Sequence, residues 1–283
     1  MTLRIDLVTG LAYPEITASD ALLADELARR GAEVRARPWN DPGDADREGG
    51  DVVVIRSSWD FHTDVDRYED WVAEVDAVST LLNPLELVRW NLRKQYLLEL
   101  IAQGAPLPRT ARIGAGATDV PSWVTGEAPV VVKPLVGASG VGVELLDADD
   151  APEALAAMAS GDTELIVQEF VDDVADGEWA LVFLGGRYSH AFQRVPVPGE
   201  FRVNSGYGGT VRGGDPGTEL IALAEGVLEL LPGPTVYARV DLMVGVAGTV
   251  VMEVEVNEPS ICLHLHPDAP RRFADAVLDR AGR

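Results

Sequence analysis

The segment VVMEVEVNEPS, residues 250–260, carries oxygen-bearing side chains at every second position. If it forms a strand, Glu253, Glu255 and Asn257 leave the same face, because successive side chains of a strand point to opposite sides. A half-buried strand shows this alternation when one face is solvated, whereas a row of hard oxygen ligands is what Mg²⁺ requires. Taken alone, the row favours the solvated face, so the other motifs must decide.

A lysine and a glycine-rich turn lie close together in the segment VVVKPLVGASGVG. Lys133 ends the apolar run, and Ser139 and Gly140 lie in the turn that follows it. Backbone amides of such a turn can surround a phosphate chain while a nearby ammonium group neutralises its charge. Because the lysine precedes the glycines, the pattern differs from a Walker loop. A tight hairpin turn without a ligand is the alternative.

The loop RSSWDFH follows the continuous apolar run Asp51–Ile55, which is typical of a strand buried on both faces of a parallel sheet. Loops at the carboxyl ends of such strands are where open α/β sheets bind ligands. We therefore predict a substrate site here, with Arg56 holding a carboxylate in bidentate fashion. The alternative is a helix-capping loop with Trp59 packed over the core. The residues of the predicted substrate site are Arg56, Ser57, Ser58 and His62.

The elements that must position these residues follow from the spacing of apolar side chains. Up to residue 88 the pattern predicts a β-α-β opening, a buried strand and a further helix, which indicates an α/β organisation. The next helix stops at Gly104. The predicted strands are Leu3–Val8, a short one around Val34 and Asp51–Ile55, and the predicted helices are Asp20–Arg30, Asp66–Ala77 and Arg89–Gln103.

The second half of the chain alternates short strands, glycine turns and helices. Gly185 and Gly186 mark a hairpin turn, and Phe201–Gly217 is a long glycine-rich loop, which in a compact domain is usually functional or disordered. If the later turn GVAG has three residues, Asp241 faces Glu253 across two antiparallel strands, whereas a four-residue turn puts Asp241 on the other face. The remaining predictions are strands in VVVKPL, VGVELL, LIVQEF, VYARVDLM and VVMEVEV and helices over Asp150–Ser160, Thr218–Leu231 and Pro270–Arg280.

The composition bounds the functions that the chain can have. It has 283 residues, 47% of them hydrophobic, which is enough for two domains with a sizeable core. The formal net charge of −23 would repel nucleic acid and anionic membranes, so we expect neither as a partner. No run approaches the roughly 20 apolar residues of a membrane span, and no secretory signal is visible. With Cys262 as the single cysteine, we expect a cytoplasmic protein without a cysteine-bound metal.

Taken in order, the motifs over about residues 88–260 resemble the ATP-grasp superfamily of carboxylate-activating ligases, and within it the glutathione synthetase branch. The resemblance implies an ATP-grasp fold of α/β and α+β type with a Rossmann-like domain in front. It implies an N-terminal substrate-binding domain over 1–88, a central subdomain over 89–170 and a C-terminal catalytic subdomain over 171–283, with ATP between the last two.

The same resemblance implies which residues meet ATP. Lys94 and Lys133 resemble the two ATP-binding lysines of the family, QEFV resembles the linker strand that meets adenine, and Glu178 resembles the carboxylate that holds the ribose hydroxyls. The segment RVPVPGEFRVNSGYGG is similar to the loop that covers the phosphates. The residues implied for ATP are Lys94, Lys133, Ser139, Gly140, Gln168, Glu169, Phe170, Val171 and Glu178, and those implied for catalysis are Arg194, Arg202 and Asn204.

The resemblance also bears on the opening question, because an aspartate followed by a Glu-x-Asn pair is the magnesium-ligand pattern of the family. Asp241, Glu255 and Asn257 match that pattern. We therefore expect these three residues to bind Mg²⁺, with Mn²⁺ as the alternative ion. Glu253 is either a further ligand or a neighbour of the site.

The activity implied is transfer of the terminal phosphate of ATP to a small carboxylate, giving an acyl phosphate that an amine attacks. The amine would belong to an amino acid, a peptide or the same molecule, in specialised metabolism. The RSSWD loop and the EPS ending also resemble a small actinobacterial group that includes the cyclo-ligase of cycloserine biosynthesis. An ATP-binding regulatory protein of this fold without turnover is the alternative function. A homodimer and a homotetramer are the assemblies considered.

Overall fold

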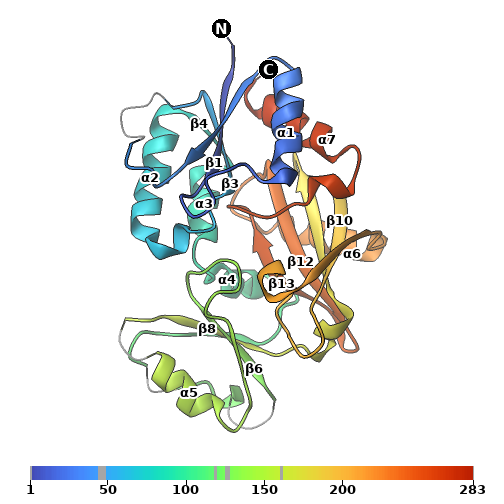
Figure 1. Ribbon diagram of the computed structural model, residues 1–283. Helices are drawn as coiled ribbons and strands as arrows, with labels where there is room; N and C mark the ends of the chain where they lie inside the picture. The colour runs from blue at the N-terminus through green and yellow to red at the C-terminus, as the bar shows by residue number, and fades with distance from the viewer. Residues whose placement is uncertain (1, 44–48, 118–119, 125–127, 160–161, 283) are drawn as a thin grey trace.

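The chain folds around three β-sheets that follow one another along the molecule (Figure 1). The structure is a computed structural model, and it describes residues 2–43, 49–117, 120–124, 128–159 and 162–282. A four-stranded parallel sheet, a five-stranded antiparallel sheet and a four-stranded antiparallel sheet are present. Among the described residues the longest helix has 14 residues, and no helix combines the length and apolar character needed to span a bilayer.

The N-terminal unit is a parallel α/β layer, as predicted. Its elements are β1 (Arg4–Thr9), α1 (Ala18–Arg29), β2 (Glu33–Pro38), β3 (Val52–Ser57), a 3₁₀ turn (Phe61–Thr63), α2 (Val65–Val78) and β4 (Thr80–Leu82). The strand order is β2-β1-β3-β4, and β3 is buried along its whole length, which explains its apolar run. The side chains of Thr17 and Asp64 cap α1 and α2. Only three residues long, β4 leaves no pattern in the sequence.

The predicted helix Arg89–Gln103 is in fact two helices, α3 (Leu85–Asn91) and α4 (Tyr96–Ala102). Between them the backbone amide of Lys94 donates to the carbonyl of Leu135 at 2.8 Å, outside the helical ladder. This partner is far away in the sequence, so helical periodicity could not indicate the break. Its consequence is that Lys94 lies at the wall of the central cavity.

A small antiparallel sheet follows. Its elements are β5 (Thr110–Ile113), a 3₁₀ turn (Ser122–Val124), β6 (Val130–Pro134), β7 (Glu144–Leu146), α5 (Ala151–Met158) and β8 (Leu165–Glu169), with strand order β5-β8-β6-β7. α5 covers one face of this sheet (Figure 1), and its Leu155 belongs to the same buried cluster as Val132. Val131 lies opposite Gln168, so Lys133, two residues further on, shares a face with Gln168.

The central sheet is antiparallel and has the order β11-β10-β9-β12-β13. The predicted hairpin turn at Gly185 and Gly186 is present, with both residues at positive φ. The segment Phe201–Gly217 is not one long loop, because part of it is a strand that pairs with β10. The elements are a 3₁₀ turn (Asp172–Asp176), β9 (Glu178–Leu184), β10 (Arg187–Val195), a 3₁₀ turn (Ser205–Tyr207), β11 (Thr210–Gly214), α6 (Thr218–Leu228), β12 (Tyr237–Gly245) and β13 (Gly248–Glu255).

The pairing of β12 with β13 brings acidic residues side by side. Gly245 pairs with Gly248, so the turn has two residues and neither turn length considered from the sequence is right. A bulge at Met252 then shifts the register by one residue, and Asp241 lies opposite Glu253. The expected facing pair is therefore present, but the bulge produces it.

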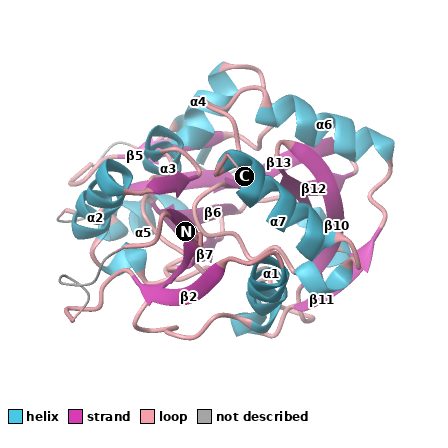
Figure 2. Cartoon of the chain, turned by 90° about the horizontal axis from the view of Figure 1, so that it is seen from above, coloured by secondary structure: helices cyan, strands magenta, loops and turns pink. Residues whose placement is uncertain are grey.

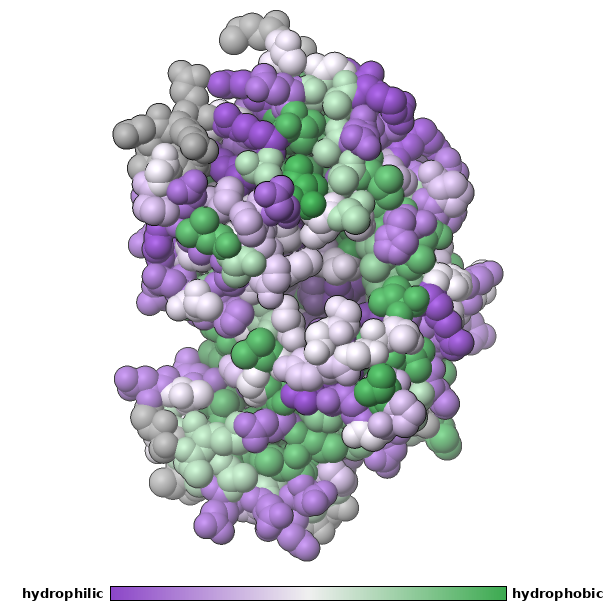
Figure 3. Space-filling model, in the orientation of Figure 1, coloured by the Kyte–Doolittle hydropathy of each residue, from purple (hydrophilic) through white to green (hydrophobic). Residues whose placement is uncertain are grey.

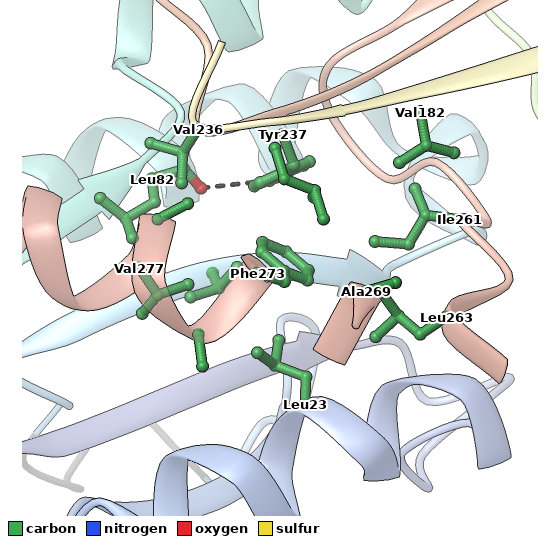
Figure 4. Packing of buried hydrophobic residues seen from close by; sticks show 14 of the residues in the cluster. Leu23, Leu82, Val182, Val236, Tyr237, Ile261, Leu263, Ala269, Phe273 and Val277 are labelled. Atoms are coloured by element: carbon green, nitrogen blue, oxygen red, sulfur yellow. Dashed lines mark hydrogen bonds between the residues drawn. The ribbon is translucent and has the colours of Figure 1, made fainter. Parts of the chain in front are cut away.

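The last helix, α7 (Ala269–Arg280), packs beside α1 and joins the parallel unit to the central sheet (Figures 1 and 2). It follows a 3₁₀ turn, Leu263–Leu265. Phe273 is fully buried and lies between Leu23 of α1 and Tyr237 of β12 (Figure 4). One hydrophobic cluster thus includes side chains from the first and the last elements of the chain.

Asn83, directly after β4, makes a second connection between the two units. Its side-chain amide donates to the carbonyls of Tyr237 and Val256 at 2.9 and 2.7 Å, and its oxygen accepts from the amide of Val236 at 2.5 Å. The parallel unit is therefore held against the ends of β12 and β13 by polar as well as apolar contacts. The boundaries at residues 88 and 170 stay a prediction.

Candidate active site

A cavity of about 520 Å³ lies where the three sheets meet, and the face drawn in Figure 3 is hollowed near its middle. All of the residues implied for ATP and for catalysis line it, and so does Glu255 from the implied metal ligands. They are Lys94, Lys133, Ser139, Gly140, Gln168, Glu169, Phe170, Val171, Glu178, Arg194, Arg202, Asn204 and Glu255. Asp241 and Asn257 are buried outside the lining, and so is Arg56.

Two lysines from different elements reach the cavity, each held by a neighbour. The ammonium of Lys94 donates to Glu253 Oε1 at 2.7 Å, and that of Lys133 donates to Gln168 Oε1 at 2.5 Å. Gln168 in turn donates to the Thr110 hydroxyl at 3.0 Å. Burial lowers the pKa of Lys133, whereas at Lys94 burial is outweighed by the carboxylates of Glu253, Glu255 and Glu258 together, and the pKa is raised. A phosphate chain between them would meet two ammonium groups.

Three carboxylates gather on β12 and β13. Oxygen atoms of Asp241, Glu253 and Glu255 lie within 4.8 Å of one another. Arg239, which the sequence did not single out, donates to both oxygens of Asp241 at 2.8 and 2.9 Å and also to Glu255. Burial, reinforced by Glu253, raises the pKa of Glu255 to about 7, while the nearby lysines lower that of Glu253 to about 2 despite burial. Arg239 lies two residues before Asp241 and therefore on the same strand face. This spacing is the only feature of the sequence that could have indicated its role.

Arg194 joins this cluster from β10. Its guanidinium donates to Asp241 at 2.5 Å and to the carboxylate of Glu178. Burial raises the pKa of Glu178, and Arg194 opposes that effect. The Nε of Arg194 is buried and has no hydrogen-bond partner within the described part of the chain. Arg194 therefore holds two carboxylates, while its Nε is left without a partner in the described part of the chain.

The donor set fits a hard divalent cation, because Asp241, Glu253 and Glu255 all supply carboxylate oxygens. Asn257 is placed differently. Its Oδ1 accepts from the Tyr68 hydroxyl at 3.1 Å, and its buried Nδ2 has no partner among the residues described. The oxygen and nitrogen of an amide group have nearly the same shape, so the side chain can also be placed with the two exchanged. Nδ2 would then donate to the Tyr68 hydroxyl, and Oδ1 would be free to bind an ion. Asn257 as a metal ligand stays a prediction.

The segment that resembles the phosphate-covering loop, residues 194–209, contacts the glycine-rich turn. The guanidinium of Arg202 lies 3.6 Å from the centre of the Tyr207 ring and pairs with Glu200 at 2.8 Å. The Tyr207 hydroxyl donates to the Gly140 carbonyl at 3.1 Å. Gly140 has a φ of +74°, and a Cβ there would lie 3.0 Å from Asn204 Oδ1. Glycine is therefore needed for the two loops to approach this closely.

The other end of the cavity is apolar. Phe170 and Val171 line it together with Met243 and Met252 of the central sheet. The ring of Phe170 meets that of Phe201 edge-on, with the ring centres 6.3 Å apart. Apolar walls with a few polar groups are typical of small-molecule sites, and they suit the flat ring of a purine.

The surroundings of Arg56 correct its predicted role. β3 continues through Ser57, so Arg56 belongs to the strand and not to the loop after it. Its side chain is 2% exposed and does not line the cavity. The guanidinium donates to Asp20 at 2.9 Å and to the Pro259 carbonyl at 2.8 Å, and it lies over the rings of Tyr237 and Phe273. These contacts engage the guanidinium N–H groups that would hold a substrate carboxylate in bidentate fashion.

The other residues of the predicted substrate site also lie outside the cavity lining. Ser57 is fully buried, and its hydroxyl has no partner in the part of the chain that is described. Ser58 Oγ lies 3.0 Å from the Tyr68 hydroxyl, and His62 Nδ1 lies 2.9 Å from the carbonyl of Trp59. Trp59 is the residue of this loop that reaches the cavity, together with Phe61.

Asp60 organises the loops at this end of the cavity. Its carboxylate accepts from Trp39 Nε1 at 2.7 Å, from Asn40 Nδ2 at 3.0 Å and from the amide of Ala12 at 3.2 Å. It therefore joins the loops that follow β1, β2 and β3, and the first of these loops carries Tyr13, which lines the cavity. A single loop aspartate has no sequence pattern that would reveal this role.

Five consecutive backbone carbonyls, those of residues 257–261, each accept a side-chain hydrogen bond. The distances lie between 2.7 and 3.0 Å. The donors, in the order of the carbonyls, are Tyr237 Oη, Trp59 Nε1, Arg56 Nη2, Arg239 Nη1 and His190 Nε2. Arg56 thus contributes to the cavity by holding its wall.

Comparison with known proteins identifies the family. Residues 103–267, more than half of the chain, match the ATP-grasp domain of prokaryotic glutathione synthetase. The chain belongs to the ATP-grasp ligases. Residues 5–83 match a second family, described as the N-terminal domain of the D-cycloserine synthetase DcsG.

Individual relatives align with different fractions of this ATP-grasp ligase. The cycloserine biosynthesis protein DcsG of Streptomyces lavendulae is 31% identical over 260 residues, which are 86% of this chain and 87% of that protein. A crystal structure of D-cycloserine synthetase DcsG has a TM-score of 0.86 and 28% identity, over 98% of this chain and 99% of that one. A probable alpha-L-glutamate ligase of Aeromonas salmonicida (strain A449) is 32% identical over 59% of this chain and 55% of that ligase.

Family membership confirms the predicted ATP-grasp fold and the predicted class of activity. The protein is an ATP-dependent carboxylate-amine ligase, and the alternative of a binding protein without turnover is not supported. Ligases of this family use ATP and Mg²⁺. The roles of the individual residues around the cavity stay predictions.

The pH dependence of stability tests whether burial keeps His190, which donates to the Ile261 carbonyl, neutral in the folded protein. Burial lowers the pKa of His190 from 6.5 to about 4. Between these two pH values the side chain is protonated in the unfolded chain and neutral in the folded protein. Protonation of this histidine in the unfolded chain lowers the free energy of unfolding as the pH falls from 6.5 toward 4. The expected loss between pH 7 and pH 5 is about 1–2 kcal/mol. Urea unfolding at both pH values measures this loss.

The matched control is His190→Gln, whose amide can donate to the same carbonyl but does not titrate. The difference in unfolding free energy between pH 7 and pH 5 should be smaller in this variant than in the wild type. An equal difference in both proteins would show that His190 is not held neutral by the fold.

Proposed function

We propose that the protein transfers the γ-phosphate of ATP to a small carboxylate and couples the acyl phosphate to an amine. The observation that carries this proposal is the charge arrangement of one cavity. Lys94, Lys133 and Arg194 line the same cavity as Glu253 and Glu255. Cations suit the phosphates and hard oxygen ligands suit Mg²⁺, so the two groups together favour phosphoryl transfer.

The basic residues would act by position and charge, and no protein nucleophile is required. Lys94 and Lys133 neutralise the phosphates of ATP, while Arg194, with its unpartnered Nε, meets the phosphate that is transferred. Arg202 and Asn204 cover the phosphates from the segment that contacts Gly140. Excluding water in this way protects an acyl phosphate from hydrolysis.

The acidic residues would hold the ion. Asp241, Glu253 and Glu255 would bind Mg²⁺, or Mn²⁺ in its place, and Asn257 would complete the set if its amide oxygen turns toward the ion. Bound there, the ion supplies positive charge for the phosphate oxygens. Arg239 bonds Asp241 and Glu255 in the structure, and it would keep them in position when phosphate enters.

The remaining parts of the cavity would receive adenosine and the substrates. The backbone of Gln168–Val171 and the apolar end would hold adenine, and Glu178 would hold the ribose. The amine substrate is an amino acid, a peptide or a group of the same molecule. The name of the Streptomyces relative, which refers to cycloserine biosynthesis, supports a role in specialised metabolism. A homodimer and a homotetramer stay the proposed assemblies.

The reaction products test this proposal. Proteinogenic amino acids of both configurations and short peptides are screened for substrate-dependent release of nucleotide. With a true substrate we expect one ADP and one inorganic phosphate per turnover, because the cations gather at the terminal phosphate. Stoichiometric AMP and pyrophosphate would mean that the carboxylate is activated as an adenylate, and the acyl-phosphate mechanism would be wrong.

The metal assignment predicts the behaviour of Glu255→Gln. The substitution preserves size at the end of a strand, so the fold should be retained, but one anionic ligand is lost. Turnover should fall at least about tenfold at limiting Mg²⁺ and recover in part as Mg²⁺ is raised. Glu225→Gln, an exposed change on α6, is the control and should behave as the wild type. Wild-type activity of Glu255→Gln at limiting Mg²⁺ would remove Glu255 from the metal site.

A further inference from the structure

The two lysines of the cavity are held by different kinds of acceptor. Lys94 and Lys133 are the only lysines in the sequence. The ammonium of Lys94 is paired with the Glu253 carboxylate at 2.7 Å, so much of its charge is compensated inside the protein. The ammonium of Lys133 instead donates to the amide oxygen of Gln168 at 2.5 Å. Since an amide carries no net charge, this contact fixes the ammonium group without neutralising it.

Strand pairing places Lys133 and its partners in one row. Thr110 on β5 lies opposite Gln168 on β8, and Gln168 lies opposite Val131 on β6. Lys133 follows Val131 by two residues and therefore leaves the same face of the sheet. The row runs across three neighbouring strands, from Thr110 through Gln168 to Lys133. Gln168 and Lys133 line the cavity, whereas Thr110 lies behind them, outside the lining.

The hydrogen bonds along this row can run in one direction only. The Thr110 hydroxyl donates its single proton to the Pro108 carbonyl at 2.8 Å, because a carbonyl can only accept. The same hydroxyl oxygen then accepts from Gln168 Nε2, which lies 3.0 Å away. At the other end of the row the ammonium group can only donate, so it requires the amide oxygen. Both ends therefore give the Gln168 amide the same orientation.

Burial makes this orientation important. Gln168 is 1% exposed, so bulk water cannot replace a partner that its amide loses. If the amide were reversed, its NH₂ group would face the ammonium of Lys133. Its oxygen would then face the Thr110 hydroxyl, whose proton is already donated to Pro108. The hydroxyl of Thr110 thus excludes the orientation that would release Lys133.

We propose that Thr110 is a positioning residue for nucleotide binding. Its hydroxyl orients the Gln168 amide, and the neutral amide oxygen holds Lys133 while its charge stays available for the phosphates. An ammonium group has three N–H donors, so two of them remain for phosphate oxygens. Thr110 acts through the other two residues and does not contact the nucleotide. The inference rests on the proposed role of Lys133 at the phosphates.

Binding of a non-hydrolysable ATP analogue with Mg²⁺, measured by calorimetry, tests the proposal. Thr110→Val keeps the shape of the side chain and removes the hydroxyl, whereas Thr110→Ser keeps the hydroxyl. We expect the dissociation constant to rise about three- to tenfold in Thr110→Val, as for one lost hydrogen bond, and to stay near the wild-type value in Thr110→Ser. The control is Thr249→Val, at a half-buried position of β13 outside the cavity lining, which should leave the constant unchanged.

Two further variants show through which residue the effect acts. In a Lys133→Gln background, Thr110→Val should cause no additional loss, because the group that Thr110 positions is gone. Gln168→Glu keeps an acceptor of nearly the same shape, but its negative charge would compensate the ammonium. We expect Gln168→Glu to weaken binding of the analogue at least as much as Thr110→Val does.

The lysine signals report on position directly. Because the chain has two lysines, lysine labelled with ¹³C at Cε gives one NMR signal for each, and Lys133→Gln assigns them. In the free protein Thr110→Val should shift the signal of Lys133 and leave that of Lys94 in place, and Thr110→Ser should restore the wild-type spectrum. A general loss of structure would move both signals and lower the urea midpoint. If Thr110→Val behaves in that way, Gln168→Glu decides the test.

Four outcomes would overturn the proposal. They are wild-type affinity of Thr110→Val, equal weakening by Thr110→Ser, the same loss from Thr110→Val in the Lys133→Gln background, and wild-type affinity of Gln168→Glu. Failure of the proposed role of Lys133 is a separate result. It is detected as wild-type affinity of Lys133→Gln for the analogue, while the Lys133 signal of the otherwise unchanged chain still responds to Thr110→Val.

Discussion

The cavity depends on how the backbone of residues 257–261 is hydrogen-bonded. This segment leaves the sheet after β13, so its carbonyl groups need donors other than strand neighbours. Arg56 and Trp59 supply two donors from the parallel unit, and the central sheet supplies the other three. A buried carbonyl that loses its donor costs about 1–3 kcal/mol. Five such bonds therefore fix an irregular segment between two units, and they give the cavity a rigid wall.

Charge compensation is the second constraint. Asp241, Glu253 and Glu255 gather in a chain with a formal net charge of −23, and Lys94, Arg194 and Arg239 bond to them. Replacing a buried ion pair by apolar groups is often neutral or stabilising, so such a network is weak evidence for stability. We interpret the network as a binding site for the phosphates of ATP and for Mg²⁺. The same cations lie where the phosphates would bind, and the same carboxylates lie where Mg²⁺ would bind.

The sequence predicted the parts of this arrangement that depend on local pattern. The buried run of β3, the hairpin at Gly185 and the resemblance of the lysine and Glu-x-Asn motifs were sufficient for the fold and the class of activity. What could not be predicted depends on distant partners. The helix breaks at Lys94 because of Leu135, and Arg56 is withdrawn from the cavity by Asp20 and Pro259. The bulge at Met252 and the role of Arg239 likewise require the paired strands.

Transfer of oxygen from the substrate carboxylate to phosphate is the most direct test of the account. A carboxylate substrate found by the screen is labelled with ¹⁸O in both carboxylate oxygens, and the inorganic phosphate formed is analysed by mass spectrometry. An acyl phosphate is formed by attack of a carboxylate oxygen on the γ-phosphate, and that oxygen leaves with the phosphate when the amine attacks. We predict one ¹⁸O atom in each inorganic phosphate released with ADP. Unlabelled phosphate, or label recovered in AMP, would contradict the acyl-phosphate mechanism.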